Sequence, residues 1–145
     1  MERKRYLLKG FGADEKAVQN GLERLLTLNA AYKNLAIVVP KLGDVRHTIL
    51  VPVLGADLAS QLIKNGSVQT ADGVSIALIS KATFEQNKSA DAYLLLWATP
   101  ETIQQAESSA YNAKAIIVVT WSPTEAAEWE ETNAVETIYS SPTPA

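Results

Sequence analysis

The sequence lacks cysteine altogether and contains a single histidine, His47. The absence of cysteine excludes disulfide bridges, thiol catalysis and thiolate metal sites, and it is consistent with a reducing compartment. One histidine is too few for a histidine-based metal centre, and the carboxylates are too scattered along the chain to indicate a metal site of their own. We therefore predict no metal site, and the sequence does not identify a cofactor.

Several motifs that carry known chemistry are also missing. No Gly-Lys-Ser or Gly-Lys-Thr occurs, which excludes a P-loop, and no Gly-x-Ser-x-Gly occurs, which excludes the usual serine hydrolase turn. No apolar run reaches membrane-spanning length, and the first residues show no signal-peptide pattern. The net charge of −3 favours neither nucleic acid nor an anionic membrane as a partner. We expect a soluble, cytoplasmic protein that binds neither.

The remaining composition is that of one folded domain. Hydrophobic residues make up 47% of the 145 residues and charged residues 20%, which is enough apolar material for a core. We expect a single domain over residues 1–139 and a flexible C-terminal tail, residues 140–145, which contains two prolines. The short basic cluster of Arg3, Lys4 and Arg5 adjoins Glu2, and we interpret it as a solvated terminus.

Three segments that are almost continuously apolar, residues 35–39, 92–97 and 115–120, indicate the fold class. A strand with one solvated face alternates polar and apolar residues, so these segments are typical of strands buried on both faces of a parallel sheet. Helical patterns separate them, and Asp72-Gly73 predicts the turn of a β-hairpin. We predict a three-layer, Rossmann-like α/β domain with a mostly parallel sheet of five or six strands and one β-hairpin.

Two of the predicted strands run into the same kind of helix start. Thr99-Pro100 and Ser122-Pro123 each place a capping hydroxyl before a proline, and proline is tolerated at the first helical position. Glu125 stands three residues after Ser122, which predicts a reciprocal capping box. Between residues 44 and 66 we expect a broken helical connection, because Pro52 interrupts a continuous helix.

The predicted architecture indicates where a ligand binds. In an open parallel α/β sheet, ligands bind beyond the carboxyl ends of the strands, where helix N-termini also offer N–H groups to an anion. Lys41 and Lys81 follow predicted strands and carry the charge that a phosphate or carboxylate needs, although solvated loop lysines are common in any protein. The predicted ligand-binding residues in these loops are Gly10, Gly12, Lys41, Asp44, Ser80, Lys81, Thr99 and Ser122.

Other residues at the strand ends leave alternatives open. Gly10-Phe11-Gly12 follows the first strand, but Glu15 stands where a dinucleotide fingerprint needs its third glycine, so a tight turn is the simpler interpretation. Trp97 and Trp121 also follow strands. Each tryptophan could stack on a base, contact a partner protein or cover the rim of the core.

We therefore consider three hypotheses for the function of the protein. The first is a binding domain for a small anionic molecule, with nucleotides as one class, and without clear catalytic machinery. The second is a protein-interaction or assembly domain that contacts a protein partner or a second copy through Trp121, Trp129 and an edge strand near residues 134–139. The third is an enzyme that uses His47 with Asp44 for acid–base chemistry.

Overall fold

The structure is a computed structural model, and it describes residues 3–10, 14–27, 32–41, 48, 50–70, 73–86, 90–110, 113–122 and 124–140. Some sequence-based predictions fall on other residues and lie outside the described part of the chain: Gly12, Asp44, His47, Asp72, Pro123 and the tail after Ser140.

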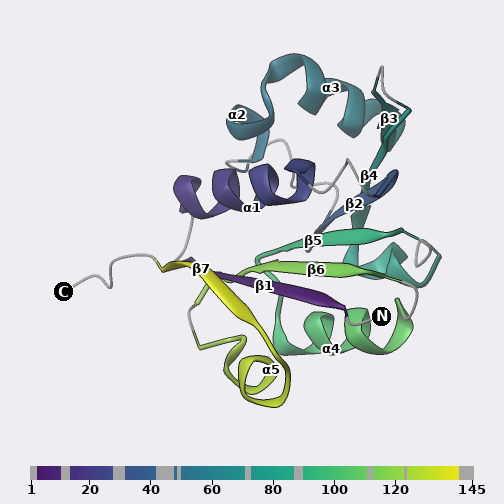
Figure 1. Ribbon diagram of the computed structural model, residues 1–145. Coiled ribbons are helices and arrows are strands. Elements are labelled where there is room, and N and C mark those ends of the chain that lie inside the picture. The colour runs from purple at the N-terminus through teal and green to yellow at the C-terminus, as the bar shows by residue number, and fades with distance from the viewer. Residues whose placement is uncertain are drawn as a thin grey trace.

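Strands and helices alternate along most of the chain (Figure 1). The strands are β1 (Lys4–Lys9), β2 (Asn34–Val39), β3 (Ser67–Gln69), β4 (Ser75–Ser80), β5 (Ala92–Leu96), β6 (Ala115–Val119) and β7 (Glu136–Ser140). The helices are α1 (Glu15–Thr27), α2 (Leu50–Leu54), α3 (Ala56–Asn65), the 3-10 helix η3 (Lys81–Gln86), α4 (Pro100–Ser109) and α5 (Ala127–Thr132).

All seven strands form one sheet in the order β3-β4-β2-β5-β6-β1-β7. The strand pairs are parallel apart from β3 with β4, which form the predicted hairpin. Strands β2 and β6 both run parallel to β5, so the apolar segments lie side by side and point the same way. The predicted α/β fold class is confirmed, and the sheet has seven strands where we expected five or six.

Helices cover both faces of the sheet and form the three predicted layers (Figure 1). Helices α1, α2 and α3 pack on one face, where Leu22 and Leu62 meet alternate residues of the central strands. The 3-10 helix η3 and helices α4 and α5 cover the other face through Phe84, Ile103 and Trp129. Every residue of β5 and of β6 is buried, which explains why these strands are uniformly apolar rather than alternating. Within the described ranges, every helix is too short or too polar to cross a membrane.

Two helical segments test the local sequence signals. The predicted break before residue 66 is present, because α2 ends at Leu54 and Gly55 adopts a positive φ of 91° before α3. Pro52 lies in the first turn of α2, where its missing N–H costs little. The predicted helix start at Ser122 is wrong: α5 begins at Ala127 and has no side-chain cap.

A capping-box contact nevertheless forms ahead of α5. The Glu125 carboxylate accepts a hydrogen bond from the Ser122 N–H at 2.8 Å, as predicted. The Glu125 N–H, however, donates to the backbone carbonyl of Ser122 at 3.0 Å, and the Ser122 hydroxyl lies 3.2 Å from that of Thr124. Ser122 therefore begins a turn rather than the helix.

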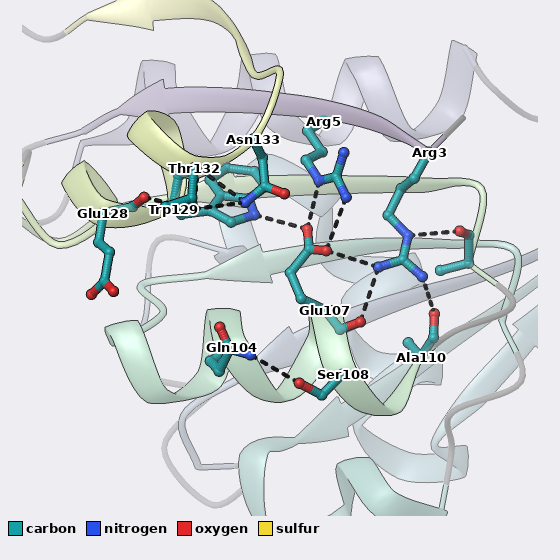
Figure 2. Close-up of polar contacts among 11 residues, drawn as sticks. Arg3, Arg5, Gln104, Glu107, Ser108, Ala110, Glu128, Trp129, Thr132 and Asn133 are labelled. Carbon is teal, nitrogen blue, oxygen red and sulfur yellow. Dashed lines mark hydrogen bonds and ion pairs between the residues drawn. The ribbon is translucent and has the colours of Figure 1, made fainter. Parts of the chain in front are cut away.

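The basic N-terminal segment is not the solvated terminus that we expected, because Arg3 and Arg5 bind Glu107 of α4 (Figure 2). Glu107 Oε1 accepts hydrogen bonds from Arg5 Nε at 2.7 Å and from Trp129 Nε1 at 2.8 Å. Glu107 Oε2 accepts from Arg3 Nη1 at 3.0 Å and from Arg5 Nη2 at 3.1 Å. One carboxylate thus joins β1, α4 and α5.

Arg3 also closes the C-terminal end of α4. Its guanidinium donates to the carbonyls of Glu107, Ala110 and Ala113 at 3.2, 2.7 and 2.9 Å. The last carbonyls of a helix have no partner within the helix and carry partial negative charge, so a cation there is stabilising. Lys4, whose side chain alternates with these two arginines, is exposed.

The environment of Glu107 favours its ionised form. Burial raises the pKa of the Glu107 carboxyl, but hydrogen bonds from Arg5 and Trp129 and the positive charges of Arg5 and Arg3 outweigh this effect, so that the pKa lies below its ordinary value. A carboxyl whose pKa is lowered by folding stabilises the protein above the pKa of the unfolded chain, near 4.3. That contribution is lost as the pH falls through the lower pKa of the folded state.

We expect Glu107→Gln to lower the free energy of unfolding at pH 7 by about 2–3 kcal/mol, because both guanidinium groups lose a partly buried anion. Urea unfolding measured between pH 7 and pH 3 checks this. The difference between wild type and variant should shrink as the pH falls below about 4. Glu128→Gln, an exposed substitution on α5, serves as the control and should change stability by less than about 0.5 kcal/mol. A Glu107 variant as stable as this control would contradict the account.

Candidate functional site

The candidate site lies where neighbouring strands send the chain to opposite faces of the sheet. The connection after β2 leads to α2 and α3, whereas the connections after β4 and β5 lead to η3 and α4 on the other face. Strand β2 lies between β4 and β5. Chain segments that diverge in this way leave a crevice beyond the carboxyl ends of the strands, which is the usual binding position in such sheets.

Two adjoining hollows of about 420 and 230 Å³ occupy this position. Both are lined by Val39 at the end of β2, by Pro40 and Lys41 after it, and by Trp97 and Thr99 after β5. We call the two hollows together the β2–β5 crevice. Its remaining described lining residues are Val38, Thr48, Lys81, Leu96, Ala98, Thr102, Trp121 and Glu125.

The crevice wall is largely apolar and has few charges. Lys41 is exposed and forms no ion pair with a described residue. Lys81 lies 3.5 Å from the carboxylate of Glu101, which is itself highly exposed. Glu125 is the acidic residue of the described lining. The arrangement therefore offers limited positive charge beside an apolar surface.

Thr99 connects the crevice to the start of α4. Its backbone is extended, its hydroxyl accepts a hydrogen bond from the Thr102 N–H at 3.4 Å, and Pro100 follows at the first helical position. This is the helix start predicted from the sequence. The N-terminal end of α4 carries partial positive charge and thus adds to the field of Lys41 and Lys81.

Trp97 shows two unusual features at the end of β5. Its φ is +54°, a left-handed conformation that costs a non-glycine residue on the order of 1–3 kcal/mol. Its N–H donates to the Val119 carbonyl at 2.7 Å, which holds the turn, while the indole Nε1 is buried and lacks a hydrogen-bond partner within the described part of the chain. Strain and an unsatisfied donor at a strand end are typical of functional positions.

Trp121 lines the same hollow as Trp97 and is 52% exposed. Its ring meets that of Trp97 edge to face, with centroids 6.3 Å apart and planes at 82°. The Glu125 carboxylate accepts from the Trp121 N–H at 3.1 Å as well as from the Ser122 N–H. The backbone that presents this indole is thus fixed by the acid of the same crevice.

The structure brings three of the predicted ligand-binding residues together: Lys41, Lys81 and Thr99. Ser80 and Ser122 lie next to the crevice, but their hydroxyls lie 3.2 Å from those of Thr83 and Thr124. Gly12 and Asp44 lie outside the described residues, as does His47, so the acid–base hypothesis stays a prediction.

Gly10 lies apart from the crevice, where β1 and β6 end. A Cβ on Gly10 would be 2.9 Å from the Thr120 carbonyl oxygen and 3.1 Å from Ala17 Cβ. The Thr120 hydroxyl donates to the Gly10 carbonyl at 2.9 Å. Close packing therefore requires the glycine, whatever its part in ligand binding.

Sequence reasoning did not predict three polar lining residues as part of the site: Thr48, Thr102 and Glu125. The capping signal at Glu125 was visible, but it indicated a helix start rather than a crevice wall. Thr102 follows from the helix start at Thr99, since the third residue after a capping residue faces back toward it. Thr48 carries no signal in the sequence that we can identify.

Another hollow, of about 570 Å³, lies between α4 and α5 and is lined by Glu101, Glu125 and Glu128 around Ile103 and Trp129. None of the predicted ligand-binding residues lines it, and most of its lining comes from α4 and α5 rather than from the loops that follow the strands. Nor do the described ranges contain any group of three residues suited to hold a metal ion. The β2–β5 crevice is therefore the stronger candidate site.

Comparison with known proteins identifies the fold and no family. The chain matches no protein-family model and no curated protein sequence. Among solved structures it is similar to the large terminase of a thermophilic bacteriophage, with 11% identity and a TM-score of 0.51 over 95% of this chain and 40% of that one. A large terminase ATPase domain from a Thermus phage shows 14% identity and a TM-score of 0.45 over 81% of this chain and 59% of that one. The chain thus spans less than two thirds of either protein, and the first likeness supports the α/β fold alone.

We expect Thr99→Ala to lower the free energy of unfolding by about 1 kcal/mol, because the variant leaves the first turn of α4 without its cap. Thr99→Ser retains an acceptor oxygen and should remain within about 0.5 kcal/mol of wild type. Denaturant unfolding at pH 7 measures both. Equal losses in the two variants would show that the methyl group, rather than the cap, stabilises this end of the crevice.

Proposed function

We propose that the protein binds a small anionic molecule, of which nucleotides are one class, in the β2–β5 crevice. One observation supports the proposal most strongly. Lys41, Lys81 and the start of α4 line one partly apolar crevice, and this crevice lies where the connections after neighbouring strands diverge to opposite faces of the sheet. An apolar pocket with a few convergent polar groups is the usual form of a small-molecule site.

The site supports binding better than catalysis. Among the described lining residues, the ionisable side chains of acids and bases are limited to Glu125, Lys41 and Lys81. The Glu125 carboxylate already accepts two backbone N–H groups. We therefore propose a binding role and assign no catalytic residue or cofactor.

Of the features that favoured the protein-interaction hypothesis, the edge strand and Trp121 remain, whereas Trp129 does not. Trp129 is buried and donates its indole N–H to Glu107, so it is unavailable to a partner. Strand β7 does end the sheet, and Trp121 remains exposed. An edge strand can pair with a strand of another chain. Light scattering tests this alternative: a concentration-independent monomer would argue against self-association through β7.

A thermal-shift panel of nucleotides, sugar phosphates, inorganic phosphate and small carboxylates tests the binding proposal. A ligand present at about 100 times its Kd should stabilise the protein by about 2.7 kcal/mol and raise Tm by roughly 5–10 °C. Lys41→Gln should weaken binding of the best ligand by about tenfold, which corresponds to about 1.4 kcal/mol, because it removes the cation without an ion-pair partner in the described lining.

Lys64→Gln supplies the matched control, since Lys64 is an exposed lysine near the end of α3 and outside the crevice. Its affinity for the same ligand should equal that of wild type. The proposal fails if no anion in the panel shifts Tm, or if both lysine variants bind like wild type.

A further inference from the structure

The side chains around Trp121 restrict the chemical class of the ligand, and this inference rests on the proposed function. Within the described part of the chain, Trp121 is the large hydrophobic residue that remains exposed. It lies on the same hollow as Val39 and Pro40, and its edge-to-face contact with Trp97 holds the ring from one side. A planar ring bound here would cover indole surface that is otherwise in water.

Trp121 is held in place by its neighbours, as a side chain on which a planar ligand stacks should be. Its backbone N–H is bound by Glu125, and the neighbouring Trp97 is held through its own N–H by Val119. A side chain whose position is fixed before binding loses little conformational freedom when a ligand arrives. Stacking of a base on an aromatic side chain typically changes affinity by about tenfold or more.

The charges of the crevice limit how much negative charge the ligand carries. Lys81 is offset by Glu101 at 3.5 Å, and Glu125 adds a negative charge to the hollow that Lys41 also lines. One lysine without an ion-pair partner in the described lining matches one anionic group better than a triphosphate, which carries several negative charges.

The chain also lacks a cradle for a polyphosphate. No Gly-Lys-Ser/Thr motif occurs in the sequence. At the end of β1, where such loops begin, Gly10 is packed against Thr120 and Ala17. Lys41 and the start of α4 are therefore the described groups available to one phosphate or carboxylate.

We infer that the ligand is a planar heteroaromatic ring that carries a single anionic group, as nucleoside monophosphates do. The ring stacks on Trp121, Trp97 positions Trp121 from the side, and the anion binds at Lys41. Trp97 is a positioning residue in this arrangement, because its ring packs in a T-shaped contact with that of Trp121.

Isothermal titration calorimetry with four nucleoside monophosphates, adenosine, ribose 5-phosphate and ATP tests the inference. At least one monophosphate should bind about tenfold more tightly than ribose 5-phosphate and than adenosine, and ATP should bind no more tightly than AMP. Trp121→Ala should weaken monophosphate binding about tenfold and leave ribose 5-phosphate binding unchanged, whereas Trp121→Phe should stay within about threefold of wild type.

Tyr32→Leu is the aromatic control, because Tyr32 precedes β2 at the opposite end of the sheet. Its affinities should match those of wild type. Equal binding of ribose 5-phosphate and the monophosphates, with no effect of Trp121→Ala, would overturn the stacking platform while the anion-binding proposal stands. ATP binding more than tenfold tighter than AMP would overturn the single-anion restriction. If only anions without an aromatic ring bind in the thermal-shift panel, the heteroaromatic ligand class is wrong while the anion-binding proposal stands. If no anion binds, both are wrong.

Discussion

The pairing of β2 with β5 is the interaction on which the rest of the structure depends. Leu35 to Val38 pair in parallel with Ala92 to Leu95, and all of these residues are buried, on both faces of the sheet. Parallel strands place their carboxyl ends at one edge of the sheet, and here the two chains then leave for opposite faces. The crevice is thus a consequence of strand order, and its apolar wall continues the core that holds the strands together.

Several of the charged side chains in the structure hold elements of the fold together rather than face a possible ligand. Glu107 draws Arg3, Arg5 and Trp129 into one cluster on the α4–α5 face (Figure 2), and none of these four residues lines the crevice. Glu125 fixes the Trp121 segment through two backbone N–H groups. What remains for a ligand is an exposed indole, one lysine without an ion pair in the described chain and the start of a helix.

The sequence predicted those parts of the fold that depend on residues close together in the chain. Continuous apolar segments predicted the buried strands, Thr99-Pro100 predicted the start of α4, and Gly66 ends α3 in a left-handed conformation as a C-terminal glycine should. Tertiary effects could not be predicted in this way. The ion pairs of Arg3 and Arg5 with Glu107 join residues more than 100 positions apart. The left-handed backbone at Trp97 is a conformation that a residue with a side chain rarely adopts. The strand order determines which of the predicted loops share a crevice. For the site, Lys41, Lys81 and Thr99 were brought together, whereas Gly10 was required by packing against Thr120.

The most direct test of the central claim, that the ligand binds in the β2–β5 crevice, uses the three tryptophans of the chain as internal reporters. Trp97 and Trp121 line the crevice, while the indole N–H of Trp129 is held by Glu107. Nitrogen-15 NMR resolves three indole N–H signals, which single Trp→Phe variants assign. During titration with AMP, the account predicts that the signals of Trp97 and Trp121 shift with one common Kd while that of Trp129 stays in place. A saturable shift of Trp129 alone, or binding that leaves all three signals unchanged, would contradict it.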